Sequence, residues 1–476
     1  MSRPLPRQGS FGAWKGVAVA GFDSLVREGE HRGSVRKESS IVIEGGRRLC
    51  GAVPISGSKN AALALIAGAL LASDGQTVLR NLPRISDIAD LVAILEGIGV
   101  RTGFEEDGRT VCLDATVLRT HEPPSALVSR MRGSLQLLGP MLSRIGRVRL
   151  AQPGGCNIGA RAIDLHEKGL RALGSTIEVG EGSIFAEAPS TGLRGAAVYL
   201  DKPSVGATMN LMMAAALAQG ETIIENAAQE PDVEDLANLI VAMGGDVSGQ
   251  GTGLVRVRGV AALHGAEFEV SPDRIEGGTY AMAAAITGGD LFLLGANPAH
   301  LRPILMKLAE LGLVIEESAS GIRVAHPDPG RRLPAVDLIA MPHPGFPTDL
   351  QQPWSSLATL ADGTCTVVDK VYEGRFRHLG ELARMGAKVK VEGQTAVITG
   401  VSSLSGAEID ASDLRAGAGL VLAGLAARGR TRVYGIRHID RGYENLVNKL
   451  AAVGASIWRE DSSGERVEGD APWASD

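Results

Sequence analysis

The sequence predicts an α/β protein of two domains, assembled from six copies of one unit in which strand, polar turn, apolar helix, glycine and strand follow in order. Its 476 residues are too many for one ordinary hydrophobic core. The unit recurs along nearly the whole chain, which indicates a repeat architecture. Because one unit cannot bury its apolar helix alone, the simplest packing places three units in each domain with the helices inward.

Each copy is followed by an amphipathic helix that ends directly before a glycine. These helices are predicted at residues 91–98, 170–173, 236–243, 305–311, 379–385 and 446–453. Ordinary α/β alternation without homologous units is the alternative. The recurrence of glycine at the same point of every copy favours six related units.

The opening turn of each copy holds a charged side chain at or just before the start of its helix. In chain order these are Lys59, Arg132, Lys202, Asp273 with Arg274, Asp349 and Arg415. The unpaired N–H groups of a helix N-terminus carry about half a positive charge, so several that converge on one cleft form an anion site. Any one of these residues alone is better explained as a helix cap or a surface salt bridge. Their repetition at one structural position predicts a polyanionic ligand.

A glycine-hinged stretch at residues 152–166 carries a thiol, a guanidinium, a carboxylate and an imidazole, from Cys156, Arg161, Asp164 and His166. Proline and glycine at 153–155 disfavour helix and strand, so we expect a mobile surface loop. A guanidinium can grip a planar anion, and a thiol can transfer a proton or attack. A glycine-rich turn with a buried, inert cysteine is the alternative.

Composition argues against several classes of function. A net charge of −6 and a pI near 5.9 disfavour nucleic acid as a main partner, so any basic site must be local. The four cysteines lie far apart without metal-ligand spacing, which disfavours zinc and disulfides and fits a reducing cytoplasm. The longest apolar run, residues 61–72, is too short to cross a bilayer. We expect no metal, no nucleic acid and no membrane partner.

Seven motifs carry a resemblance to a known family. They lie at residues 55–63, 153–161, 204–208, 225–231, 272–276, 346–349 and 438–444. In this order they resemble the UDP-N-acetylglucosamine 1-carboxyvinyltransferase family, over about residues 41–459. The resemblance implies an inside-out α/β barrel in two domains of βαβαββ-like units. It also implies transfer of the enolpyruvyl group of phosphoenolpyruvate to the 3′-hydroxyl of UDP-N-acetylglucosamine with release of phosphate, the first committed step of peptidoglycan precursor synthesis, without a cofactor.

Domain boundaries and terminal segments are expected as follows. One domain comprises residues 40–58 plus 272–460, and the other, with the cysteine loop, comprises 59–271. Residues 1–39 mix basic side chains with glycine and serine and are expected to be a flexible extension without a secretory signal. Residues 461–476 are expected to be a flexible tail.

The resemblance also implies roles for individual residues. Those expected to hold the phosphate and carboxylate of phosphoenolpyruvate are Lys59, Arg161, Arg415 and Arg441. Asp349 is the expected base, with a raised pKa in a closed cleft, and Cys156 the expected acid. The residues expected on the nucleotide sugar are Asn60, Arg132, Asp164, Ser204, Val205, Gly206 and Thr348. Lys202 is expected to face the diphosphate, and Arg375 to help set domain closure.

Two other functions fit the same residues. A paralogue could transfer enolpyruvyl to another nucleotide or sugar acceptor or to shikimate 3-phosphate, although shikimate enzymes lack this cysteine loop. A catalytically silent binding protein on the same fold is the third possibility. Intact Lys59, Cys156, Asp349, Arg415 and Arg441 argue against it. Asp349 could also merely cap its helix, and His166 and His438 are expected to pack or hydrogen-bond rather than to bind metal.

Overall fold

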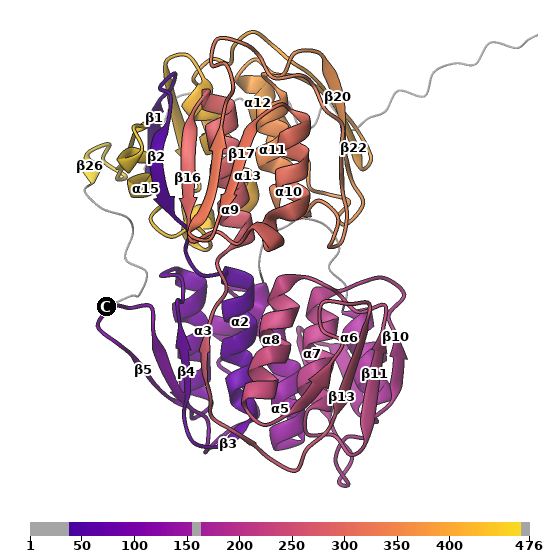
Figure 1. The fold of residues 1–476 in the computed structure, drawn as a ribbon. Coiled ribbons are helices and arrows are strands. Elements are labelled where there is room, and N and C mark those ends of the chain that lie inside the picture. Colours follow the sequence, from indigo (N-terminus) through magenta and orange to yellow (C-terminus); the bar gives the residue numbers. More distant parts are fainter. Residues whose placement is uncertain (1–37, 155–162, 468–476) are drawn as a thin grey trace, which may run out of the picture. The chain divides into compact units, whose positions relative to one another are not determined.

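The computed structural model describes residues 38–154 and 163–467 and confirms the α/β class (Figure 1). Each of the six units contributes one central helix that is largely buried, and four of these sequences, at 59–68, 205–215, 274–287 and 414–426, consist mainly of small and apolar residues. The central helices are α2 (Lys59–Gly68), α5 (Leu138–Ile145), α7 (Val205–Ala215), α9 (Arg274–Thr287), α11 (Gln351–Ala358) and α13 (Leu414–Ala426).

A second helix follows in every unit and ends before glycine, as the sequence predicts. These helices are α3 (Ser86–Gly97), α6 (Asp164–Ala172), α8 (Pro231–Ala242), α10 (Pro298–Glu310), α12 (His378–Arg384) and α15 (Leu446–Ala452). The glycine that follows has a positive φ in each case, for example +109° at Gly99 and +103° at Gly454. Glycine adopts this left-handed conformation without a steric penalty, which explains its recurrence.

Four sheets share one strand order, in which a parallel pair is extended by an antiparallel hairpin. The first sheet has the order β10 (Ala197–Tyr199), β11 (Glu221–Glu225), β13 (Leu254–Arg258) and β12 (Asp246–Ser248). The second has the order β15 (Glu267–Glu269), β4 (Thr77–Arg80), β6 (Val111–Asp114) and β5 (Arg101–Phe104). The third has the order β19 (Leu338–Ala340), β20 (Thr364–Asp369), β22 (Thr395–Thr399) and β21 (Lys388–Glu392). The fourth has the order β2 (Cys50–Pro54), β16 (Asp290–Leu294), β18 (Gly321–Ala325) and β17 (Val314–Ser318).

The first and fourth units exchange their first strands. Strand β2 precedes α2 in sequence but pairs in parallel with β16, and β15 precedes α9 but pairs in parallel with β4. In Figure 1 the indigo strand β2 accordingly lies beside β16. The two connecting segments run side by side, since the Ser58 N–H donates to the Ser271 carbonyl at 2.7 Å.

Two sheets differ from this order. The three-stranded sheet consists of β7 (Arg147–Ala151), β9 (Ser183–Glu187) and β8 (Thr176–Gly180), and its unit opens with α4 (Ser125–Val128) and the 3₁₀ helix η2 (Arg132–Leu137) instead of a strand. The five-stranded sheet consists of β23 (Glu408–Asp410), β24 (Arg430–Tyr434), β1 (Ser40–Glu44), β25 (Ser456–Glu460) and β26 (Arg466–Val467). Its centre is thus supplied by the first described strand of the chain.

The C-terminal tail predicted from residue 461 begins with ordered structure, which corrects that expectation. The Asp461 N–H donates to the Glu465 carbonyl at 2.9 Å, and Arg466 pairs with Glu460 across the turn. Short elements complete the described chain: η1 (Ala69–Leu71), the pair β3 (Ala72–Asp74) and β14 (Leu263–His264), η3 (Thr348–Leu350) and α14 (Arg437–Asp440).

The buried apolar side chains form two clusters, one from residues 61–270 and the other from residues 41–55 and 275–457. Within the second cluster, helices α9, α11 and α13 pack against one another. Small residues permit this approach: a Cβ on Gly419 would lie 2.9 Å from the Gln352 backbone. Among the described residues, no helix is long and apolar enough to cross a membrane.

Candidate active site

A cleft of about 550 Å³ is lined by the N-terminal ends of helices from all parts of the described chain. It brings together every predicted site residue that the structure describes: Lys59, Asn60, Arg132, Asp164, Lys202, Ser204, Val205, Gly206, Thr348, Asp349, Arg375, Arg415 and Arg441. Among the described residues, eight cationic and six acidic side chains line it, whereas the whole chain has a net charge of −6. The cleft is therefore a local cationic site in an acidic protein.

Capping side chains fix where the helices begin at this cleft. The Ser58 hydroxyl accepts from the Ala61 N–H at 3.3 Å, so Lys59 is the first residue of α2. The Asp413 carboxylate accepts from the Arg415 N–H at 3.0 Å and sets the start of α13. A capping oxygen satisfies donors that the helix itself leaves unpaired. These short polar residues before apolar runs thus place both cations at the cleft.

Lys59 and Arg441 share one buried carboxylate, Asp87. Lys59 Nζ lies 2.7 Å from Oδ2, and Arg441 Nε donates to Oδ1 at 2.8 Å. Burial by itself would raise the pKa of Asp87, but the two cations outweigh burial and lower that pKa. The carboxylate therefore stays ionised and holds an ammonium and a guanidinium, which come from opposite ends of the sequence, on one side of the cleft.

Asp349 lies between two buried guanidinium groups. Arg375 Nη2 donates to Oδ1 at 2.7 Å, and Arg415 lies 3.0 Å from Oδ2 through Nη2. Burial opposes ionisation, but Arg375 and Arg415 dominate and hold the pKa of Asp349 well below its usual range. The expectation of a raised pKa is therefore wrong for this state of the cleft. The carboxylate also caps no helix end, so its alternative role as a cap is wrong too.

Thr348 and Arg415 extend this group of residues. The Thr348 hydroxyl donates to Asp369 at 2.6 Å and accepts from Arg375 Nη1 at 2.8 Å. The Arg415 guanidinium carbon lies 5.3 Å from the centre of the Tyr443 ring. Among the described residues, Nη1 of Arg415 is buried without a hydrogen-bond partner. A buried cationic donor of this kind suits an anionic ligand atom.

His166 lines the cleft and is buried, as expected for a packing role, whereas His438 is not among the described residues that line it. His166 is 6% exposed, and burial, aided by Arg132, lowers its pKa to about 4. Its Nε2 would lie only 3.0 Å from a Cβ on Gly206, so a side chain there would crowd the ring. Burial likewise lowers the pKa of His438. No group of side chains in the described ranges could hold a metal ion.

Sequence reasoning missed several residues that line the cleft: Asp87, Gln136, Glu230, Asp232, Lys370, Tyr372 and Asp413. Arg274, noted only as one of the repeated charged turns, is also there; it is buried, and its Nη2 lies 3.6 Å from Asp232. Burial raises the pKa of Glu230, whose Oε1 accepts from the His343 N–H at 3.3 Å. Two sequence signals pointed to Arg274: the charge that recurs at each helix start and the motif at residues 272–276.

Cys156 and Arg161 lie outside the described residues. The described chain stops at Gly154, where a Cβ would lie 1.8 Å from the Ser129 carbonyl oxygen. Only glycine fits this close approach, which accounts for one glycine of the motif.

The fold and the cationic cleft are those of a carboxyvinyl transferase. The family model of EPSP synthase (3-phosphoshikimate 1-carboxyvinyltransferase) matches residues 43–450, so the chain belongs to the EPSP synthase family. Within it, the chain is 48% identical over 433 residues to UDP-N-acetylglucosamine 1-carboxyvinyltransferase 1 of Halalkalibacterium halodurans. That match covers 91% of this chain and 97% of the other protein.

Solved structures agree on the fold. The enolpyruvyl transferase NikO of Streptomyces tendae superimposes with a TM-score of 0.80 at 28% identity, covering 89% of this chain and 99% of NikO. EPSP synthase of Acinetobacter baumannii gives a TM-score of 0.69 at 21% identity, covering 89% of this chain and all of the other, and this likeness supports the fold alone.

Proposed function

We propose that the protein transfers the enolpyruvyl group of phosphoenolpyruvate to the 3′-hydroxyl of UDP-N-acetylglucosamine and releases phosphate. The observation that carries this proposal is 48% identity to a UDP-N-acetylglucosamine 1-carboxyvinyltransferase along nearly the full length of both chains. The reaction opens peptidoglycan precursor synthesis, so the protein would serve cell wall biogenesis, and with it cell shape, the cell cycle and division, in the cytoplasm. The two cores correspond in this proposal to two domains, residues 40–58 plus 272–460 and residues 59–271.

The anionic groups of phosphoenolpyruvate are proposed to bind at the cationic side chains Lys59, Arg161, Arg415 and Arg441. Support comes from the unpartnered Nη1 of Arg415 and from the shared carboxylate that aligns Lys59 with Arg441. Fork-shaped guanidinium groups can grip a phosphate or carboxylate through two parallel hydrogen bonds.

Asp349 is proposed as the base that accepts the proton of the sugar hydroxyl. In the described state its two arginines make it a weak base. When the anionic groups of the substrate take over part of this ion pairing, the Asp349 carboxylate is released and its pKa rises. Cys156 is proposed as the acid that protonates the methylene carbon of the enol, because nearby cations can tune the pKa of a thiol to this task.

The nucleotide sugar is proposed to bind along the other wall of the cleft, at Asn60, Arg132, Asp164, Ser204, Val205, Gly206 and Thr348, with Lys202 at the diphosphate. The N-terminal end of α7 supports this: Ser204 uses its side-chain oxygen as the cap, so further backbone N–H groups of the first turn remain for a phosphate. Arg375 is proposed to take part in closure of the cleft through its contact with Asp349.

Phosphate release tests the acceptor. Purified protein with phosphoenolpyruvate is expected to release phosphate with UDP-N-acetylglucosamine and not with UMP, UDP-glucose or shikimate 3-phosphate. Release with another acceptor alone would support enolpyruvyl transfer but contradict the assignment to peptidoglycan precursor synthesis. Absence of release with every acceptor would leave a catalytically silent binding protein on this fold.

A further inference from the structure

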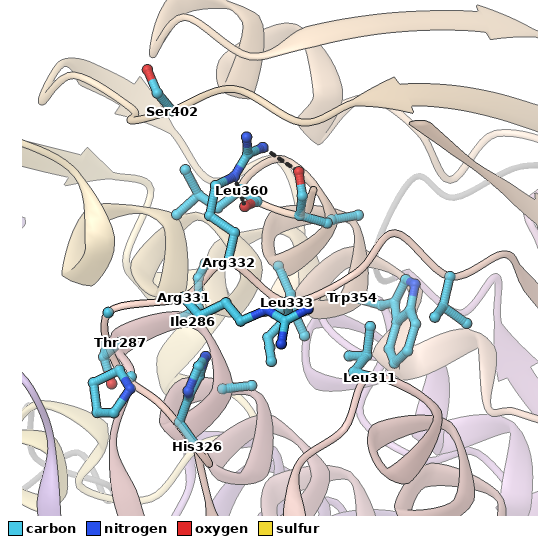
Figure 2. A pocket seen from close by; sticks show the side chains of 18 residues that line it. Ile286, Thr287, Leu311, His326, Arg331, Arg332, Leu333, Trp354, Leu360 and Ser402 are labelled. Atoms are coloured by element: carbon cyan, nitrogen blue, oxygen red, sulfur yellow. Dashed lines mark hydrogen bonds between the residues drawn. The ribbon is translucent and has the colours of Figure 1, made fainter. Parts of the chain in front are cut away.

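A second cavity lies in the C-terminal half of the chain, shown in Figure 2. It has a volume of about 230 Å³ between the C-terminal end of α9, one side of α11 and residues 329–333. Among the described residues, none lines both this cavity and the cleft. A water molecule occupies ~30 Å³ in the liquid, so the space equals the volume of about eight waters. It is therefore large enough for a small organic molecule.

The walls of this cavity are mostly apolar. Ile286, Leu311, Leu333 and Leu357 contribute aliphatic surface, and Trp354, whose ring packs against Phe346, closes part of the wall. Such a lining favours a compact apolar body over a hydrated ion, because removing apolar surface from water is favourable, whereas an ion would lose its hydration there.

Two of the polar groups in the wall are hydrogen-bond donors. Trp354 is only 1% exposed, and its indole Nε1 has no hydrogen-bond partner in the described part of the chain. His326 accepts from the Asp328 N–H through Nδ1 at 3.2 Å, so its neutral ring carries the proton on Nε2. Burial lowers the pKa of His326, which keeps the ring neutral. Buried donors of this kind require acceptors.

Two arginines add positive charge. The Arg332 side chain is fixed by the carbonyls of Leu360, at 3.0 Å from Nε, and Ala361. Arg331 extends between His326 and Trp354 in Figure 2, and its side chain forms no ion pair or hydrogen bond with any described residue. No aspartate or glutamate is found among the described residues that line the cavity. Asp362 lies 3.7 Å from Nη1 of Arg332, so among the described residues Arg331 is the arginine of this cavity that lacks a negative partner.

We propose that this cavity is a binding site for a small aromatic carboxylate. The ring of the ligand lies against the aliphatic wall beside Trp354, and its carboxylate pairs with the Arg331 guanidinium. The site is separate from the cleft and does not depend on the proposed reaction.

The test is a titration of the full chain with 4-fluorobenzoate, followed by the ¹⁹F linewidth. We expect saturable binding with a Kd of about 1 mM, as suits a ligand of this size. Arg331→Ala is expected to weaken binding about fivefold or more because the charge-assisted contact is lost. Trp354→Phe, which keeps the aromatic face and removes the donor, is expected to weaken it less. Arg302→Ala, an exposed arginine that lines neither cavity, is the matched control and is expected to bind as the wild type does.

Competition and an uncharged analogue complete the test. Neither UDP-N-acetylglucosamine nor inorganic phosphate, the anions expected in the cleft, is expected to displace the probe, and 4-fluorobenzyl alcohol is expected to bind more weakly. Absence of saturation below ~10 mM, equal binding by Arg331→Ala, displacement by either cleft anion or equal binding of the alcohol would each overturn the proposal. Because Arg331 is exposed, Arg331→Ala is expected to unfold in urea at the wild-type midpoint, which shows that this variant is folded.

Discussion

Nη2 of Arg415 lies 3.0 Å from Oδ2 of Asp349, while Nη1 of the same guanidinium is buried without a hydrogen-bond partner among the described residues. Arg375 holds the other oxygen of Asp349 at 2.7 Å. One carboxylate thus faces two cations, and the pair retains the capacity for a further anion. An anionic ligand that binds here weakens the hold of the arginines on Asp349, which links ligand binding to the strength of the base.

Asp349→Asn is expected to lower kcat by ~10²- to 10⁴-fold, the usual effect of removing a general base. It also leaves two buried guanidinium groups without their countercharge, so the free energy of unfolding is expected to fall by about 3 kcal/mol. Steady-state phosphate release and urea unfolding measure the two effects. Asp362→Asn, an exposed carboxylate just after α11, is the control for both. Turnover of Asp349→Asn at the wild-type rate would remove the base role.

The stability of the fold is expected to decrease below neutral pH because of buried histidines. His378 is 1% exposed, and burial lowers its pKa to about 4. The unfolded chain, with a histidine pKa near 6.5, binds the proton more readily, so stability is fully present above about pH 6.5 and is lost as the pH falls toward 4. For His378 alone the loss between pH 7 and pH 5 is about 2 kcal/mol.

His378→Phe is expected to remove about this part of the pH dependence, because phenylalanine does not titrate and can keep the stacking on Phe376. Urea unfolding of both proteins at pH 7 and pH 5 provides the measurement. His166, whose pKa is also lowered to about 4, keeps a similar contribution in the variant. An undiminished difference between the two pH values in His378→Phe would show that this ring is protonated in the fold.

The central helices and their cleft ends could be predicted because their signals are local. Ser58 before the run from Ala61, and Asp413 before the run from Leu414, are capping residues next to apolar segments. The glycines after the second helices are equally local signals, since each adopts a left-handed backbone conformation that other residues adopt only with strain. These features do not depend on distant partners.

Long-range relationships could not be predicted in the same way. The sequence of a strand such as β2 does not reveal its partner strand, and the exchange pairs Cys50 with Asp290 and Val78 with Glu267, residues far apart in the sequence. Asp87 reads in the sequence only as an acidic residue in the first turn of a helix. Its pairing with Arg441, and the arginines that lower the pKa of Asp349, arise from tertiary packing, so the expectation of a raised pKa failed.

Asp87→Asn is expected to raise the KM for phosphoenolpyruvate about tenfold while kcat changes less. The amide keeps the shape but loses the charge that aligns Lys59 with Arg441, so both cations become less well positioned. Asp90→Asn on the same helix, where the carboxylate pairs with Arg130, is the matched control. A KM equal to that of the control would mean that Lys59 and Arg441 are aligned without Asp87.

Cys156 is expected to be the residue that fosfomycin alkylates, faster when UDP-N-acetylglucosamine is present. In this reaction the Cys156 thiolate attacks an epoxide carbon, the carbon–oxygen bond opens, and the resulting alkoxide takes up a proton. Cys365 provides an internal control, because burial raises its pKa to about 11 and leaves almost no thiolate at neutral pH. Intact-mass and peptide analysis should therefore find one adduct, on Cys156, and none on Cys365.

Cys156→Asp is expected to keep turnover, since a carboxylic acid can also deliver a proton, and to escape inactivation because it lacks the nucleophilic thiol. Inactivation of Cys156→Asp at the wild-type rate would place the reactive thiol at another cysteine and withdraw Cys156 as the acid.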